Sequence, residues 1–107
     1  MKAFACALLV ASVGCKRSVE DDGGALFASA CARCHGSEGA GGVALVDGGP
    51  SPRNFRDHAF HLARTDEQLK QTIFNGKGAG MPAFGTMFND TQRNALVAHV
   101  RSLDSRK

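Results

Sequence analysis

The sequence of 107 residues predicts a single domain with an all-α fold, and three observations carry that prediction. Thr65 with Gln68, and Asn89 with Gln92, each have the spacing of a capping box at the start of a helix. Apolar residues then recur at every third or fourth position, as on a helix with one buried face. No segment alternates apolar and polar residues in the way that a half-buried strand does.

The first helix is expected from about residue 23 to residue 34, with Asp21 or Asp22 as its N-cap. Its apolar face follows the helical spacing and consists of Leu26, Phe27, Ala30 and Cys34. Residues 36–52 come next, and the six glycines and two prolines among them predict an irregular loop. A loop of this length in so small a domain needs a large surface, such as a cofactor, to pack against.

Three further elements follow the loop. Asp57 is expected to cap a short helix that runs through Ala63. The helix that begins after Thr65 should end at Asn75, with Gly76 as its left-handed stop. The helix that begins after Asn89 should run to Ser102 or Leu103. The residues expected on the inner faces of these two helices are Leu69, Ile73, Leu96, Val100 and Leu103.

Residues 1–14 are predicted to be an export signal, because Lys2 precedes an apolar stretch that is too short to span a bilayer. Ser12, Val13, Gly14 and Cys15 together resemble the lipobox of bacterial lipoproteins. That resemblance implies a lipid on Cys15 and a domain held at the periplasmic side of the membrane. The alternative is an ordinary cleaved signal with an unmodified Cys15. Residues 15–22 are expected to be a tether, and residues 23–107 the folded domain.

The charge of the chain argues against nucleic acid as a partner. The formal net charge is +3 and falls to +2 when the leader with Lys2 is removed. The remaining basic residues are scattered and form no stripe along one element, which nucleic-acid binding normally requires.

The pentapeptide CARCH, which begins at Cys31, predicts a covalently bound haem c. Two thiols three positions apart can add to the two vinyl groups of a haem, and the imidazole of His35 can reach its iron. A zinc site would need two further ligands, and the remaining cysteines, Cys6 and Cys15, lie in the leader. A redox-active dithiol normally follows a strand of a βαβ unit, which is absent ahead of Cys31.

The two axial ligands of the haem iron can be proposed from the same sequence. His35 is expected to bind as a neutral imidazole whose other ring nitrogen donates to a backbone carbonyl in the loop after Gly36. Met81 is the candidate sixth ligand, because neighbouring glycines let the backbone lie close to a flat ring and Pro82 stiffens the turn. A thioether ligand raises the reduction potential. The alternative is that Met81 only fills a gap in the packing.

Several other residues of the same types have simpler interpretations. His58 and His61 are expected to face solvent rather than to bind a metal or the iron. Met87 lacks the glycines and proline that frame Met81, so it is expected to pack in the core or at the surface. Arg53 is expected to be exposed, although it or Asn54 could instead meet a haem propionate.

From residue 23 to residue 103 the chain resembles the class I cytochromes c, of the small bacterial monohaem type. The resemblance rests on Gly23 and Phe27 ahead of the pentapeptide, the segment GMPAF that begins at Gly80, and the final helix. It implies the cytochrome c fold, with three main helices and loops wrapped around one covalently bound haem. In that fold the first and last helices cross, and Gly23 allows their close approach. His99 stands where the family commonly has an aromatic residue, so it could stack on Phe27.

The resemblance also implies thioether links at Cys31 and Cys34 and axial ligation of the iron by His35 and Met81. The expected function is one-electron transfer between membrane-associated redox proteins, with no small-molecule substrate. We expect no enzymatic activity, since the chain has no paired carboxylates and no nucleophile with a base. One alternative is a haem enzyme or gas sensor whose sixth iron position is open or labile. Another is a module that delivers electrons only within one larger complex.

Overall fold

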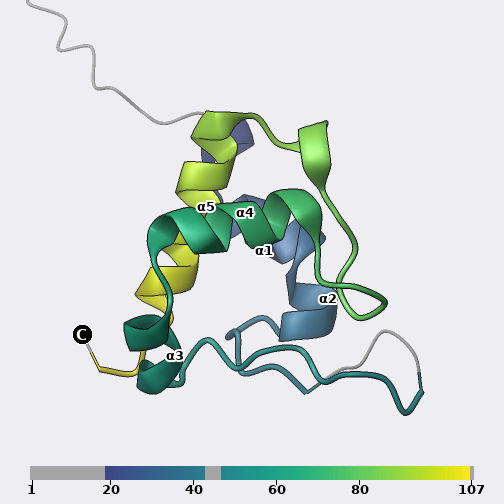
Figure 1. Ribbon diagram of the computed structural model, residues 1–107. Coiled ribbons are helices and arrows are strands. Elements are labelled where there is room, and N and C mark those ends of the chain that lie inside the picture. The colour runs from purple at the N-terminus through teal and green to yellow at the C-terminus, as the bar shows by residue number, and fades with distance from the viewer. Residues whose placement is uncertain (1–18, 43–46, 107) are drawn as a thin grey trace, which may run out of the picture.

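The computed structural model describes residues 19–42 and 47–106, which form one helical domain (Figure 1). The predicted export signal, Cys15 and most of the predicted tether lie outside the described residues, as do residues 43–46. The elements, in chain order, are the 3-10 turn η1 (Val19–Asp21) and the helices α1 (Gly23–Ala30), α2 (Ala32–His35), α3 (His58–Ala63) and α4 (Asp66–Asn75), then the 3-10 turn η2 (Gly85–Met87) and helix α5 (Asp90–Ser102). None of the described helices is long and apolar enough to cross a membrane.

The first predicted helix is divided in two by a turn at Cys31. Asp22 is the N-cap of α1, because its carboxylate accepts hydrogen bonds from the amides of Gly24 and Ala25 at 2.9 and 3.3 Å. Cys31 ends α1 with a φ of −114°, and α2 starts with the next residue. The prediction of one helix through residue 34 was therefore right in extent and wrong in continuity.

The later helices begin and end where their caps predict. The side chain of Thr65 accepts from the amide of Gln68 at 3.1 Å and the side chain of Gln68 accepts from the amide of Thr65 at 2.9 Å, which completes a capping box. Asn89 and Gln92 make the same reciprocal pair at the start of α5. Gly76 ends α4 at the predicted position and has the positive φ, 72°, that glycine allows, but its ψ of −173° is extended and not that of a left-handed helical stop.

Helix α5 crosses α1 at very short range, as the family resemblance implies. Gly23 is buried at the contact, where a Cβ atom on it would lie 2.1 Å from the carbonyl oxygen of Ala95. One turn further along, the rings of Phe27 and His99 pack with their centroids 4.9 Å apart. His99 therefore fills the place of an aromatic residue, and the approach of the two backbones depends on glycine.

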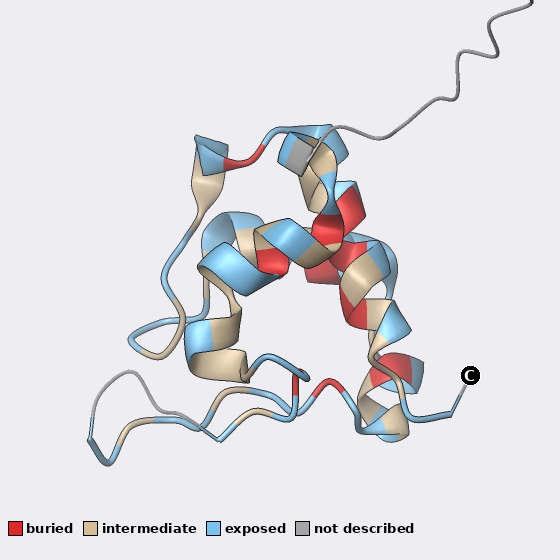
Figure 2. Ribbon diagram, turned by 180° about the vertical axis from the view of Figure 1, so that it is seen from behind, coloured by how far each residue is buried: buried red, intermediate tan, exposed pale blue. Residues whose placement is uncertain are grey.

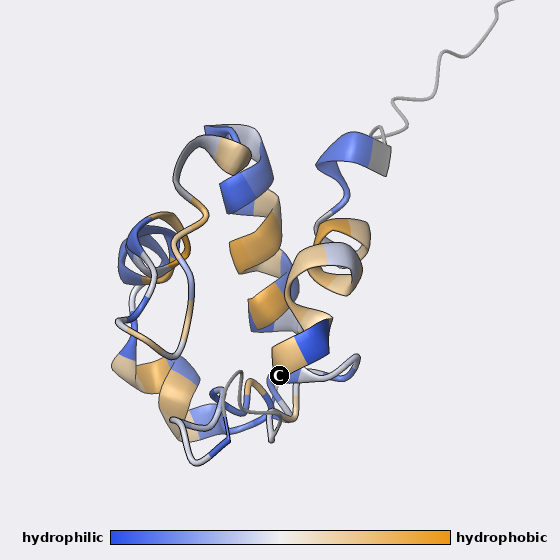
Figure 3. Cartoon of the chain, turned by 90° about the vertical axis from the view of Figure 1, so that its right-hand side faces the viewer, coloured by the Kyte–Doolittle hydropathy of each residue, from blue (hydrophilic) through white to orange (hydrophobic). Residues whose placement is uncertain are grey.

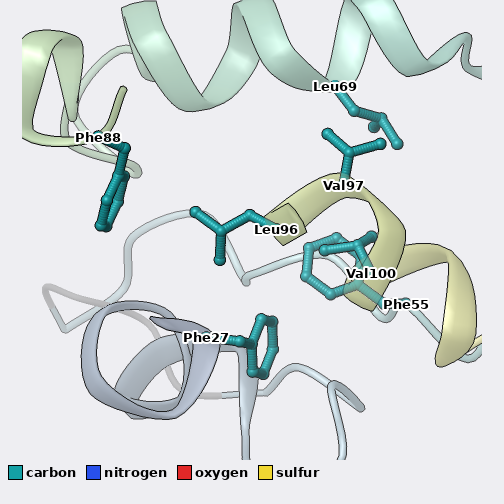
Figure 4. Packing of buried hydrophobic residues seen from close by; sticks show 7 residues of the cluster. All are labelled: Phe27, Phe55, Leu69, Phe88, Leu96, Val97 and Val100. Atoms are coloured by element: carbon teal, nitrogen blue, oxygen red, sulfur yellow. The ribbon is translucent and has the colours of Figure 1, made fainter. Parts of the chain in front are cut away.

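The core forms where α5 meets its neighbours. Buried residues concentrate on α5 and on the helices that contact it, and hydrophobic residues gather on the faces that these helices turn toward one another (Figures 2 and 3). Val97 of α5 points toward Leu69 of α4, and Phe27 and Leu96 are each only 1% exposed (Figure 4). The cluster of buried apolar side chains comprises Phe27, Phe55, Leu69, Phe88, Leu96, Val97 and Val100.

The last residues of the predicted tether are part of the folded domain. Val19–Asp21 form a 3-10 turn, and the carbonyl of Glu20 accepts a hydrogen bond from the side chain of Gln92 at 3.0 Å. This contact joins residues that are 72 positions apart, so local sequence could not reveal it. This contact places η1 beside the start of α5.

The crossing of α1 and α5 yields a first prediction. Gly23→Ala is expected to lower the free energy of unfolding by about 1–3 kcal/mol, because the new methyl group would overlap a backbone carbonyl. The measurement is denaturant unfolding of the purified protein. Gly24→Ala is the control, since its Cβ would meet nothing closer than 3.3 Å and alanine favours a helix. Equal stability of the two variants would contradict the crossing.

Candidate functional site

The turn between α1 and α2 brings the two cysteines and His35 together. The amides of Cys34 and His35 both donate to the carbonyl of Cys31, at 3.2 and 2.9 Å, so the pentapeptide forms a single helical turn. Both thiols are free and half-buried. Burial, with a smaller contribution from Cys34, raises the pKa of Cys31 to about 11. A redox-active dithiol needs a cysteine with a lowered pKa, so this environment does not favour that chemistry.

His35 is held at one nitrogen and available at the other. Its Nδ1 donates to the carbonyl oxygen of Arg53 at 3.0 Å, which identifies the acceptor that the sequence left open. The Nε2 atom has no hydrogen-bond partner among the described residues. Burial lowers the pKa of His35, and the hydrogen bond to Arg53 opposes that shift only in part. The imidazole is therefore neutral at pH 7, with Nε2 free to bind a metal.

A stacked ring completes the environment of His35. The rings of His35 and Phe55 lie with their centroids 4.4 Å apart and an interplanar angle of 22°. Phe55 is buried, and its ring also packs near the rings of Phe27 and Phe60, with centroid distances of 6.2 and 5.4 Å. Neither the backbone carbonyl of Arg53 nor the ring of Phe55 was predicted from the sequence as part of this site.

The two ends of the long loop pack against each other beside His35. The amide of Gly41 donates to the carbonyl of His35 at 2.6 Å, and the amide of Phe55 donates to the carbonyl of Gly39 at 2.7 Å. Gly41 has a φ of 78°, and a Cβ atom on it would lie 2.5 Å from the carbonyl oxygen of Pro52. A larger residue at position 41 would separate these segments, so this glycine lets the carbonyl of Arg53 reach the imidazole.

Met81 lies in a short hairpin after α4. Lys77 and Met81 form an isolated antiparallel bridge, with amide-to-carbonyl distances of 2.9 and 3.2 Å. The amide of Phe84 donates to the carbonyl of Ile73 at 3.0 Å, which ties the end of the hairpin back to α4. Met81 is half-buried. Met87, by contrast, is 68% exposed, in agreement with the prediction that it packs in the core or at the surface.

The prediction that His58 and His61 face solvent was wrong. His61 is only 8% exposed, and its Nε2 lies 2.6 Å from the carbonyl oxygen of Phe55. His58 is half-buried, with its Nδ1 2.9 Å from the carboxylate of Asp104. His58 reaches a carboxylate 46 positions away, and the burial of His61 depends on Arg101, 40 positions away, so neither is visible in the local sequence. The bond from His61 to Phe55 spans only six residues.

Arg53 is exposed, as predicted, and Asn54 is exposed as well. The guanidinium group of Arg53 lies 5.6 Å from the centroid of the Phe60 ring. The side chain of Asn54 accepts a hydrogen bond from the amide of Arg56 at 2.9 Å and so shapes the turn into α3.

The residues of this site fit a c-type haem. Two free thiols and a neutral imidazole with an available Nε2 lie on one turn, and half-buried apolar side chains adjoin them. In the described part of the chain, no three His, Cys, Asp or Glu side chains cluster as a metal-ion site would require. The residues that fit a haem are therefore those of the pentapeptide and its apolar neighbours.

Comparison with known proteins identifies the family. Residues 19–100 match the family described as cytochrome c oxidase, cbb3-type, subunit III. The chain belongs to this family. It is 35% identical over 81 residues to the cbb3-type cytochrome c oxidase subunit FixP of Azorhizobium caulinodans, and 31% identical over 90 residues to FixP of Sinorhizobium medicae. Each match covers 76% of this chain but only 26% and 29% of the relatives, so the chain spans about a quarter of their length.

A solved structure confirms the fold. The KustC0563 c-type cytochrome superposes with a TM-score of 0.68 and 30% sequence identity, over 78% of this chain and 98% of that one. The predicted cytochrome c fold is thus correct. Cytochromes of this type carry haem c covalently, so the predicted cofactor is confirmed as well.

The contact between α3 and the end of α5 yields a second prediction, on pH. The pKa of Asp104 is lowered, first by the hydrogen bond from the Arg106 amide and then by His58. A lowered pKa in the folded state means that the carboxylate stabilises the protein above its unfolded pKa, and that this contribution is lost as the pH falls through the folded pKa. Asp104→Asn is therefore expected to be less stable than the wild type at pH 7, with the difference shrinking below about pH 4.

The check is the thermal midpoint of the haem-loaded protein from about pH 3 to pH 7. Asp47→Asn is the control, because Asp47 is an exposed carboxylate of the long loop. A stability difference for Asp104→Asn that does not change with pH would contradict the ionic origin of this contact.

Proposed function

We propose that this chain is an exported one-electron carrier whose haem is attached through Cys31 and Cys34 and bound axially by His35 and Met81. The observation that carries the proposal is the hydrogen bond from His35 Nδ1 to the carbonyl of Arg53, because it fixes the tautomer that leaves Nε2 for the iron. When bound, the haem supplies an iron that alternates between the ferric and ferrous states.

The surroundings of His35 suit an axial ligand. The carbonyl of Arg53 increases the electron donation of the imidazole, as outer hydrogen-bond partners of metal-bound histidines do. The stacked ring of Phe55 limits rotation of the imidazole and excludes water from one of its faces. A ligand held in this way keeps the same geometry in both oxidation states, which favours fast electron exchange.

The hairpin from Lys77 to Met81 suits the second ligand. Its backbone bridge fixes the start of the Met81 side chain, and the hydrogen bond from Phe84 to Ile73 anchors the hairpin to α4. A thioether is a soft and neutral ligand that favours the ferrous state and raises the reduction potential. With both axial positions filled, the iron has no site for a substrate, so we propose that the chain is not an enzyme.

The partners are proposed to be redox proteins at the membrane. The FixP relatives are named as subunits of cbb3-type oxidases, which supports a partner of the membrane-bound oxidase class. Transient electron transfer needs only a small interface, which the turn at Cys31 and the hairpin at Met81 could provide. The apolar leader supports export, and the lipobox-like residues 12–15 support a lipid anchor on Cys15.

The axial ligand is tested by Met81→Ala. The ferric wild type is expected to show the far-red charge-transfer band of a sulfur-to-iron bond, and the variant is expected to lose it and to have a lower reduction potential. Met87→Ala is the matched control, because that methionine is on the surface and should leave both measurements unchanged. An intact band in Met81→Ala, or ready binding of carbon monoxide by the ferrous wild type, would support the alternative of an enzyme or gas sensor with an open sixth position.

The covalent attachments are tested by intact mass of the full chain made in a host that exports and matures c-type cytochromes. The expected mass is that of a chain cleaved before Cys15 and carrying one haem and a lipid. Cys15→Ser should carry the haem but no lipid, and the double variant with Cys31→Ser and Cys34→Ser should carry no covalent haem, because neither thioether link can form. A wild-type mass without haem would refute the attachment, and an unmodified Cys15 would refute the anchor alone.

A further inference from the structure

We propose that His61 is a positioning residue for the axial histidine: it anchors residues 53–55, which hold the imidazole of His35 by its edge and by its face. This inference rests on the proposed role of His35 as an iron ligand. His61 itself touches neither His35 nor the proposed site of the iron.

His61 is buried and fully hydrogen-bonded. Its Nε2 lies 2.6 Å from the carbonyl oxygen of Phe55, and its Nδ1 lies 3.2 Å from Nη1 of Arg101. No buried side-chain nitrogen or oxygen within the described residues lacks a partner. Removal of His61 would leave a backbone carbonyl without its side-chain donor in a poorly solvated place, which destabilises that arrangement.

The neighbours of His61 determine which nitrogen carries its proton. A guanidinium group has only protons to donate, so Nδ1 of His61 must accept from Arg101. The proton of the neutral ring is then on Nε2, where it is donated to the carbonyl of Phe55. Arg101 is itself fixed by Asp66, whose carboxylate lies 2.8 Å from its Nε, and by the carbonyl groups of His61 and Arg64.

The segment that His61 anchors makes both contacts with the ring of His35. The carbonyl of Arg53 accepts from Nδ1, and the ring of Phe55 stacks on the imidazole at 4.4 Å. The segment is held at the amide of Phe55 by Gly39, at 2.7 Å, and at the carbonyl of Phe55 by His61. Loss of one of these two anchors is expected to let the segment move away from His35.

A simpler explanation of the burial of His61 would be that it only links α3 to α5. His58 provides the comparison that separates this explanation from the proposal. His58 is on the same helix, and its hydrogen bond to Asp104 also joins α3 to the end of α5. It makes no hydrogen bond to residues 53–55 within the described chain. If His61 only joined the two helices, substitutions at the two histidines would have the same kinds of effect.

A change in residues 53–55 would alter the electronic properties of the ligand. A longer hydrogen bond from Nδ1 makes the imidazole a weaker donor to iron, which stabilises the ferric state less and raises the reduction potential. A rotated imidazole would also change the spread of the haem methyl resonances in the ferric NMR spectrum. Neither quantity responds directly to a loss of global stability.

The test compares His61→Asn with His61→Gln in the haem-loaded full chain. The amide of glutamine reaches about as far as Nε2 of histidine, whereas that of asparagine is one methylene shorter and does not reach the carbonyl of Phe55. We expect His61→Asn to raise the reduction potential and alter the methyl pattern, His61→Gln to stay close to the wild type, and the control His58→Asn to change stability only. The far-red band from Met81 should remain in all three.

The tautomer gives a measurement that needs no variant. In the ferrous wild type, nitrogen-15 NMR of the His61 ring should show a protonated Nε2 and an unprotonated Nδ1. The opposite tautomer, or a potential and methyl pattern in His61→Asn that match those of His58→Asn, would overturn the inference. A wild type without the spectra of a six-coordinate iron bound by histidine and methionine would instead refute the proposed function on which the inference rests.

Discussion

The close contact between α1 and α5 is the constraint on which the rest of the domain depends. Gly23 brings the two backbones together, and a turn later Phe27 and Leu96 form the most deeply buried part of the core. Only Cys31 separates α1 from α2, so the crossing of α1 and α5 also sets the position of the pentapeptide. The helices therefore place the thiols, while the loops complete the site.

The surroundings of His35 are built from backbone groups more than from side chains. Arg53 contributes its carbonyl, Gly41 contributes an amide and the absence of a side chain, and only Phe55 contributes a ring. Backbone groups are present at every position, so such a site tolerates changes of side chain as long as the path of the chain is kept. The buried pair of His61 and Arg101 serves that purpose from outside the site.

The local parts of the structure could be predicted from the sequence, and the long-range parts could not. Both capping boxes, the N-cap of Asp57 and the end of α4 at Gly76 depend on residues within one helical turn, and all are correct. The pentapeptide was recognisable for the same reason, and the proposal for Met81 also depends on neighbouring residues alone. The break at Cys31 was missed because its neighbours have ordinary helical character.

The burial of His58 and His61 was missed because their partners are separated from them by long stretches of chain. The bond from His58 to Asp104 spans 46 residues and that from Arg101 to His61 spans 40. One clue was present, since the two histidines lie three positions apart on a helix and so share a face. Together with the basic residue Arg101 in the last turn of α5, that spacing could have suggested a contact between α3 and α5.

The turn from Cys31 to His35 and the hydrogen bond from His35 to Arg53 can form at different stages of folding. The turn that carries Cys31 and His35 needs hydrogen bonds between near neighbours only, whereas the bond from His35 to Arg53 closes a loop of 18 residues. Closing that loop has an entropic cost that the turn does not have. During maturation, the thiols can therefore be presented for attachment by a chain that is still largely unfolded, and the loop can close over the imidazole afterwards.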